Sequence, residues 1–295
     1  MANIKIISLF FFLLFFKSFS QSKNTYEFVG GLKLNGSDEQ VVSYKITFNE
    51  EKGVIKGFSI TDLGGEHETK NTIVGTYDKN KNLLFFKEDE IVYTKSSVKK
   101  SSFCYVNFNG KMNLKSSNPK IDNKFVGLYK NETKCISGII QMVGTKKIIK
   151  LATKINTKIQ KSKKIDSKIK ESVNPLKKLD SLNMNILKET ENLQMFTKDK
   201  MIKFEISDPG VEDGDRITIY VNGKIILENY EVSNMKKIIE IPIVSKNTSI
   251  EVEAVNEGTM PPNTASVIIR DTNNELKTVT RLTKGKKTTI SIESE

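Results

Sequence analysis

Apolar and polar residues alternate in short runs over the first half of the chain, and turn residues separate these runs. Val54–Ile60, for example, alternates β-branched or aromatic residues with polar ones and contains one glycine. This pattern predicts strands with one buried face. The expected strands are Tyr26–Leu34, Val41–Phe48, Val54–Leu63, Thr69–Tyr77, Leu83–Lys87, Ile91–Thr94, Ser102–Phe108, Lys111–Leu114, Lys124–Tyr129 and Cys135–Met142. No segment with a period of 3.6 residues interrupts them, so we expect an antiparallel meander.

Turn residues and glycines refine this prediction. Asn109-Gly110 predicts a two-residue hairpin turn, and Asn49–Gly53 and Asp78–Asn82 predict longer turns. An apolar residue, one spacer and a glycine recur at Phe28–Gly30, Ile55–Gly57, Ile73–Gly75, Phe125–Gly127 and Ile136–Gly138. Because glycine weakens a strand interior, its repetition indicates sites where a curved sheet bends or two backbones approach closely.

Residues 21–145 are therefore expected to form an antiparallel domain, either barrel-like or a β-sandwich. A closed barrel would leave none of the ten short strands with an unpaired edge. The pattern resembles lipocalin and avidin barrels in architecture. Those families place a Trp at the barrel floor or in the ligand pocket, and this chain contains no Trp. The resemblance implies architecture and adds little to an argument for ligand binding.

The period changes after residue 145. Ile148, Leu151, Ile155 and Ile159 follow helical spacing, and Asn174-Pro175 predicts the end of that helix. A second amphipathic piece is expected to follow, with apolar residues at Leu176, Leu179, Leu182, Ile186, Leu193 and Phe196. We therefore interpret residues 146–203 as a Lys-rich helical linker. Its basic surface consists of Lys147, Lys150, Lys154, Lys158 and Lys161.

Most of the chain's net charge of +12 comes from this linker, which holds 16 Lys and 6 acidic residues. A basic amphipathic helix can lie on an anionic lipid surface, or bind an acidic polysaccharide or an acidic patch of a protein partner. It can also serve only as a solvated stalk. The chain has 44 Lys and 3 Arg, whereas base recognition favours Arg, so we expect no nucleic acid partner.

Strand patterns return in residues 204–295. The expected strands are Ile217–Val221, Lys224–Leu227, Lys237–Ile243, Ser249–Val255, Ala265–Arg270, Leu276–Leu282 and Thr288–Ile292, and Asn222-Gly223 predicts a tight turn. Their number and spacing predict an immunoglobulin-like β-sandwich. The fold class is therefore mainly β, with a meander domain, a helical linker and a sandwich.

Two segments of this last third carry a resemblance. Asp208–Gly223, which contains Asp-Gly-Asp, and Asn256–Ala265, which reads Asn-Glu-Gly-Thr-Met-Pro-Pro-Asn-Thr-Ala, are similar to a C-terminal module of uncharacterised exported proteins from Bacteroidota-type bacteria. The resemblance covers only this third of the chain. It implies an exported location and a β-sandwich, and it implies no activity.

The N-terminal segment has the composition of a secretory signal peptide. Lys5 precedes an apolar run from Ile6 to Phe16, and small residues at Ser18 and Ser20 precede Gln21. The run is shorter than the ~20 residues that a spanning helix needs. We expect cleavage after Ser20, a mature chain in the periplasm or outside the cell, and no later transmembrane segment. Cys104 and Cys135, the only cysteines, are then expected to form a disulfide, the alternative being two buried thiols.

Candidate chemistry is sparse. Asp62, Glu66, His67 and Glu68 lie close in sequence and are candidate metal ligands, but the chain has no second His for a zinc site of the HExxH kind. A polar turn is the alternative interpretation. Asp208, Asp213 and Asp215 are candidate calcium ligands, although their spacing differs from an EF-hand loop. No catalytic constellation and no cofactor motif emerges.

The leading hypothesis is a non-enzymatic exported binding protein that acts at or near the cell envelope. The alternatives are a lipocalin-like carrier of a small apolar ligand and a carboxylate-based hydrolase that uses Glu66 or Glu68. Among 35 acidic residues, sequence alone does not reveal which pairs are close in space.

Overall fold

The computed structural model describes residues 24–36, 41–162, 165–166, 170, 173, 175 and 185–295. The expected signal peptide, and Leu176, Leu179 and Leu182 of the second expected helix, lie outside the described residues. The strands of the barrel are β1 (Asn24–Leu34), β2 (Val41–Glu51), β3 (Val54–Thr61), β4 (Thr69–Asp78), β5 (Leu83–Thr94), β6 (Tyr105–Lys111), β7 (Lys120–Leu128) and β8 (Lys134–Gly144), with a 3-10 turn at Lys100–Ser102.

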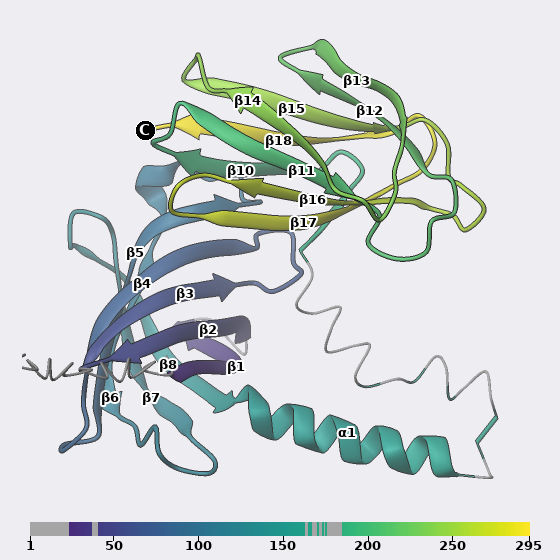
Figure 1. The fold of residues 1–295 in the computed structure, drawn as a ribbon. Coiled ribbons are helices and arrows are strands. Elements are labelled where there is room, and N and C mark those ends of the chain that lie inside the picture. The colour runs from purple at the N-terminus through teal and green to yellow at the C-terminus, as the bar shows by residue number, and fades with distance from the viewer. Residues whose placement is uncertain are drawn as a thin grey trace, which may run out of the picture.

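The remaining elements follow the barrel in the chain. They are α1 (Thr145–Lys161), β9 (Ile186–Lys188), β10 (Asn192–Thr197), β11 (Met201–Ser207), β12 (Arg216–Val221), β13 (Lys224–Glu231), β14 (Lys237–Pro242), β15 (Asn247–Ala254), β16 (Asn263–Arg270), β17 (Glu275–Leu282) and β18 (Lys287–Ser294). Figure 1 shows the barrel, the long α1 that leaves its base, and the second group of strands above it.

Strands β1 to β8 form a closed antiparallel barrel. Each strand pairs with the next, and β8 returns to pair with β1, where Phe28 lies opposite Gly144. This confirms the mainly β fold and the antiparallel meander, and of the two architectures left open for this domain the barrel is the one formed. Two runs predicted as separate strands, Leu83–Lys87 and Ile91–Thr94, are parts of the single long strand β5.

The predicted hairpin turn at Asn109-Gly110 is wrong. Both residues lie inside β6, opposite Phe85 and Leu84 of β5. The physical reason is that Met112 and Leu114 are buried in the barrel core. The chain therefore continues past Gly110 instead of reversing its direction there. Lys111–Leu114 is accordingly not a separate strand.

The recurring glycines lie where neighbouring strands touch. A Cβ atom on Gly30, Gly57, Gly75 or Gly138 would come within about 2.0 Å of a carbonyl oxygen of the adjacent strand. A side chain has no room at that distance, so the backbones can approach this closely only at glycine. The predicted close approach of backbones at these positions is confirmed.

Replacing Gly57 by Ala is therefore expected to lower the free energy of unfolding by about 1–3 kcal/mol, the usual cost of overpacking. The added methyl group would meet the Thr47 carbonyl oxygen at 2.0 Å. The matched control is Gly210→Ala, because a Cβ there meets only Asp208 at 3.8 Å. Urea denaturation of both variants measures the difference, and equal effects would contradict this account.

Aromatic side chains fill the barrel interior. Phe28, Phe48, Phe86, Phe108 and Tyr44 are each at most 1% exposed, and the rings of Phe86 and Phe108 stack at 5.3 Å. Isoleucine, leucine and methionine side chains complete this core. The interior that a lipocalin-like carrier would need for a ligand is thus occupied by the protein's own side chains.

The second group of strands forms two packed layers of five strands. One layer has the order β13-β12-β15-β18-β10 and the other β14-β11-β16-β17-β9. Their inner faces form one apolar core, in which Ile217, Val252, Val267 and Ile290 are fully buried. All seven strands predicted for this region are present, and the turn at Asn222-Gly223 joins β12 to β13 as expected.

The helix expected around Ile186–Phe196 is wrong, because these residues form β9 and β10. Strand β9 runs parallel to β17, and β10 runs parallel to β18. Leu187, Leu193 and Met195 are fully buried in the sandwich core. Burial between two layers decides the structure here, so the sandwich begins before residue 204 and the linker ends before residue 203.

Barrel and sandwich are joined through one continuous sheet. The end of β5 pairs with β10, where Tyr93 lies opposite Met195 and Thr94 opposite Gln194. Val92 and Tyr93 of this barrel strand are buried in the sandwich core. The two parts therefore share a hydrophobic contact as well as backbone hydrogen bonds.

Candidate functional site

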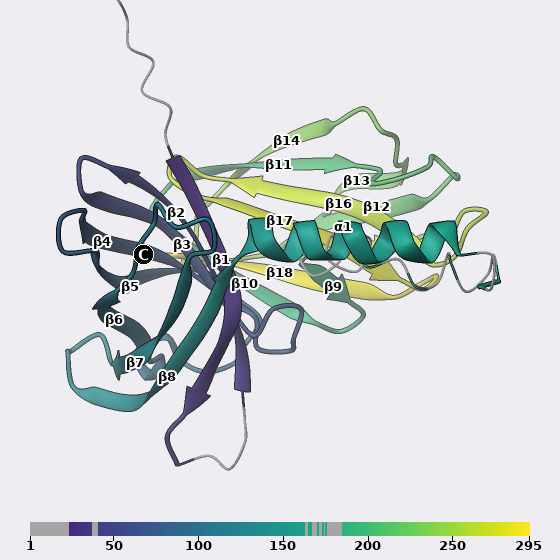
Figure 2. The ribbon, with the colours of Figure 1, turned by 90° about the horizontal axis from the view of Figure 1, so that it is seen from below.

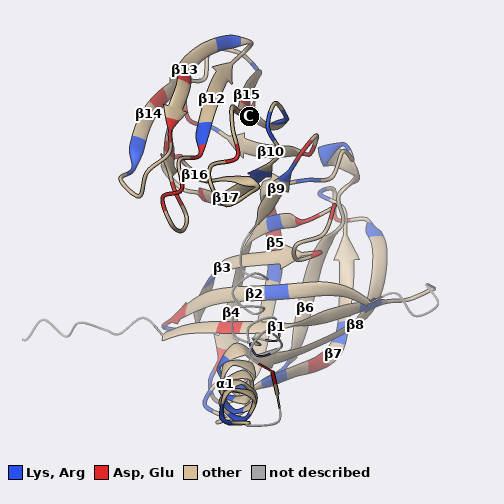
Figure 3. Cartoon of the chain, turned by 90° about the vertical axis from the view of Figure 1, so that its right-hand side faces the viewer, with Lys and Arg blue, Asp and Glu red and all other residues tan. Residues whose placement is uncertain are grey.

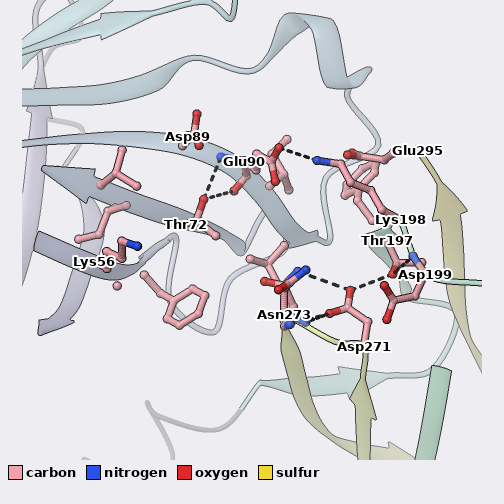
Figure 4. A pocket seen from close by; sticks show the side chains of 18 of the residues that line it. Lys56, Thr72, Asp89, Glu90, Thr197, Lys198, Asp199, Asp271, Asn273 and Glu295 are labelled. Carbon is pink, nitrogen blue, oxygen red and sulfur yellow. Dashed lines mark hydrogen bonds and ion pairs between the residues drawn. The ribbon is translucent and has the colours of Figure 1, made fainter. Parts of the chain in front are cut away.

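A cleft of about 470 Å³ lies where the barrel meets the sandwich, beside the pairing of β5 with β10 (Figure 4). The barrel strands β3, β4 and β5 form one side. The start of the β10–β11 connection, the β16–β17 turn and the C-terminal residue form the other. The polar and aromatic residues that line it are Asn49, Lys56, Phe58, Thr72, Asp89, Glu90, Phe196, Thr197, Lys198, Asp199, Asp271, Asn273, Asn274 and Glu295.

Hydrogen bonds and ion pairs hold the polar side chains of the cleft in place. Lys198 Nζ lies 3.0 Å from Glu90 Oε1, which connects the sandwich side to the barrel side. The hydroxyl and backbone N–H of Thr272 both donate to Asp199 at 2.7 Å, and these bonds lower the pKa of Asp199. Fixed, ionised carboxylates of this kind suit the recognition of a polar ligand.

Asp271 has a similar structural role in the cleft wall. Its carboxylate accepts hydrogen bonds from the Thr197 hydroxyl at 2.8 Å and from the Asn274 N–H at 2.6 Å.

Sequence reasoning missed this cleft because its lining comes from segments more than 200 residues apart. No local pattern connects Lys56 to Glu295.

The turn that carries the only histidine is held together by its own carboxylates. Asp62 accepts a hydrogen bond from the His67 N–H at 3.0 Å, and Glu68 accepts one from the Gly64 N–H at 2.6 Å. Glu66 and His67 are exposed, whereas Glu68 is buried. The structure thus brings Asp62 and Glu68 into the turn's hydrogen bonds and leaves His67 facing outward.

Glu68 also connects the turn to the barrel–sandwich junction. The Tyr93 hydroxyl donates to Glu68 Oε1 at 2.7 Å. Burial raises the pKa of Tyr93, and the negative charge of Glu68 acts in the same direction, so the phenol remains a proton donor. This contact gives Glu68 a structural role, in contrast to the catalytic role that the hydrolase alternative assigns to it.

The three candidate calcium ligands lie near the end of the sandwich. Asp208 follows β11 directly, and Asp213 and Asp215 precede β12. Burial raises the pKa of Asp215, and the negative charges of Asp213 and Asp208 raise it further. Asp208 and Asp213 are therefore close enough to Asp215 for their charges to act on it.

The basic linker surface lies on α1, which leaves the barrel directly after β8 and contacts β1 and β8 (Figure 2). Lys147, Lys150, Lys154, Lys158 and Lys161 are all exposed along it. Figure 3, which looks along α1, shows basic residues on this helix. Apolar side chains are exposed on the same helix, namely Ile149 at 50%, Leu151 at 56% and Ile155 at 42%. The helix thus presents positive charge and apolar area together.

The two cysteines form a disulfide, as expected. It joins Cys104, immediately before β6, to Cys135 in β8, with their Cα atoms 6.1 Å apart. The bond therefore fastens two barrel strands that are separated by β7.

A buried carboxylate in the barrel also escaped sequence analysis. Glu88 of β5 accepts hydrogen bonds from the Ser59 hydroxyl at 2.6 Å, the Tyr44 hydroxyl at 2.9 Å and the Val106 N–H at 2.7 Å. Burial raises the pKa of Glu88. The alternation in β5 indicates which face Glu88 lies on, but not that three donors surround it.

Within the part of the chain that the structure describes, no helix combines the length and apolar character needed to cross a membrane. No family model, no curated protein and no solved structure matches the chain.

Proposed function

We propose that this protein is an exported, non-enzymatic binding protein of the cell envelope that docks on an anionic lipid surface through α1. The observation that supports this most directly is the composition of α1. Six of its 17 residues are Lys, none is acidic, and three large apolar side chains are exposed.

The charge of α1 favours a negatively charged partner. Each Lys near an anionic membrane contributes about 1 kcal/mol, and the contribution decreases with added salt. Five lysines recur at helical spacing on one face, so they can meet one surface together. An isolated surface lysine would give no such combined effect.

The exposed apolar residues favour a lipid surface over an acidic polysaccharide. Leu151 and Ile155, which are four residues apart and therefore lie on one side of the helix, would bury their side chains at the boundary between headgroups and acyl chains, as interfacial helices do. A polysaccharide offers charge without comparable apolar area. A helix that lies in the interface also needs no spanning segment.

Cosedimentation with vesicles tests the proposal. The mature chain from Gln21 onward is expected to bind vesicles that contain phosphatidylglycerol, and to bind phosphatidylcholine vesicles at least tenfold more weakly. Replacing Lys150, Lys154 and Lys158 together by Gln is expected to weaken binding about 100-fold, since three contributions of about 1 kcal/mol are lost. Leu151→Asp should also weaken it.

The matched control replaces Lys224, Lys237 and Lys284 by Gln, because these lysines are exposed on the sandwich and far from α1 in the chain. This variant should bind like the unaltered protein at moderate salt. Equal loss in both triple variants would show that net charge, and not α1, determines binding.

Export is tested by N-terminal sequencing of the protein purified from its native cells. The sequence should begin at Gln21, and an intact Met1 would contradict the proposed export.

A further inference from the structure

Two loops meet at one end of the sandwich and are fastened by hydrogen bonds. One loop joins β11 to β12 and holds Asp213 and Asp215, and the other joins β15 to β16. The Thr264 N–H donates to Asp215 Oδ2 at 2.7 Å, and the Met260 N–H donates to Asp213 Oδ2 at 2.9 Å. One oxygen of each carboxylate is thereby used within the protein.

The other oxygen of each carboxylate has no hydrogen-bond partner. Asp208 Oδ2, Asp213 Oδ1 and Asp215 Oδ1 are all buried from solvent and accept no hydrogen bond. A buried acceptor without a donor costs about 1–3 kcal/mol in the absence of a ligand, so such atoms are rare in folded proteins. Three such oxygens in one loop are therefore acceptors suited to a positively charged ligand.

A fourth unpartnered oxygen lies in the same place. Asn263 is fully buried, and its side-chain N–H groups donate to the Arg216 carbonyl at 3.1 Å and to the Asn256 carbonyl at 3.0 Å. Its Oδ1 atom accepts no hydrogen bond. Asn263 precedes Thr264, whose N–H donates to Asp215, and it contacts Arg216, the residue after Asp215, so Asn263 lies next to the loop that carries the carboxylates.

The negative charge of the cluster is not compensated by a side chain. None of the ion pairs formed by the described residues includes Asp208, Asp213 or Asp215. Asp215 is only 1% exposed, so its carboxylate is almost entirely removed from solvent. Buried carboxylates in proteins are generally paired, protonated or bound to a metal ion.

We propose that Asp208, Asp213, Asp215 and Asn263 bind a calcium ion. Ca²⁺ takes six to eight oxygen ligands, including carboxylates and amide carbonyls, and tolerates irregular geometry. The cluster contains only oxygen acceptors, which disfavours zinc, a metal that prefers His and Cys. Water would complete the coordination.

The cation has to draw the side chains together. Among the described residues, no three acidic, histidine or cysteine side chains are already arranged to hold a metal ion. Asp213 lies between Gly210 and Gly214 in the β11–β12 connection, and Gly214 has a positive φ of 88°. A bound ion would therefore join the two loops and order this end of the sandwich.

Calorimetric titration of the calcium-free mature chain with CaCl2 tests the proposal. We expect one ion per chain and a thermal unfolding temperature that rises with calcium concentration. Asp213→Asn and Asp215→Asn, tested separately, should each weaken calcium binding at least tenfold. The control Asp122→Asn, in the exposed part of barrel strand β7, should bind calcium like the unaltered protein.

Circular dichroism of each variant establishes that it is folded, so that lost binding can be assigned to the lost ligand. No heat and no shift of unfolding at 10 mM CaCl2 would overturn the proposal. An unfolding temperature that rises on acidification but does not respond to calcium would also overturn it, because a shared proton would then account for the unpartnered oxygens. Vesicle binding through α1 is measured independently and does not depend on the outcome.

Discussion

Glu88→Leu is expected to lower the free energy of unfolding by about 3–5 kcal/mol, since each buried donor that loses its partner costs about 1–3 kcal/mol. Leucine fits a barrel interior but accepts no hydrogen bond. The hydroxyls of Tyr44 and Ser59 and the N–H of Val106 would all lose their acceptor. Urea denaturation followed by circular dichroism measures the change.

Two further variants identify the cause of that loss. Tyr44→Phe and Ser59→Ala each remove one donor and leave Glu88 with its other partners, so each should cost about 1 kcal/mol, the net contribution of a typical hydrogen bond. A Glu88→Leu protein as stable as either of these would show that the three donors find other acceptors. The network would then contribute little to the barrel.

The pH dependence of stability gives a separate test of Glu88. Burial raises its pKa in the folded state above the ordinary value near 4.5, so the folded protein binds this proton more tightly than the unfolded chain does. The ionised form is therefore penalised at neutral pH, and the penalty is relieved as pH falls through the raised pKa. The stability of the unaltered protein relative to Glu88→Gln should rise on acidification over that window.

The barrel was predictable because its signals are local and repeated. Alternation fixes which face of each strand is buried, and the spaced glycines mark where strands touch, as Gly57 does against Thr47. Neither signal depends on which residues meet across the molecule. The need to cover strand edges favoured a closed barrel but did not exclude a sandwich, because closure depends on the pairing of β8 with β1.

The errors arose where tertiary contacts override local pattern. Leu193 and Phe196 follow a spacing that also suits a helix, yet both pair with β18 in a strand. Leu193 is buried in the sandwich core, and Phe196 packs with Ile91 and Tyr105 of the barrel. Asn109-Gly110 has the composition of a turn, but β5 needs a partner there. A short apolar run near a linker is compatible with either a helix or a buried strand.

Candidate sites were predictable only in part. Asp208, Asp213 and Asp215 are close in sequence, so their residue type and spacing were enough to identify them as candidates. Asn263 was missed because it lies about 50 residues away and enters the cluster through the β15–β16 loop. The cleft at the junction was missed for the same reason.

Removal of the disulfide is the other change with a large expected effect. Replacing Cys104 and Cys135 together by Ala should lower the free energy of unfolding by roughly 3–4 kcal/mol, because the bond closes a loop with a sequence separation of 31 residues and restricts the unfolded chain. Urea denaturation of the variant, and of the unaltered protein with and without a thiol reductant, measures it.

Comparing the reduced unaltered protein with the double variant separates the stability contributed by the cross-link from the stability contributed by packing of the sulfur atoms. Reduced unaltered protein should be nearly as unstable as the double variant, since both lose the cross-link while only the variant loses the sulfurs. If the double variant and the reduced protein each lose less than about 1 kcal/mol, the unfolded chain is already ordered between β6 and β8 without the disulfide.

If the full cost is found, a reducing compartment would deprive the barrel of a large part of its stability, because domains typically have only about 5–15 kcal/mol in total. Such a requirement would favour the proposed export, since disulfides form and persist in oxidising compartments.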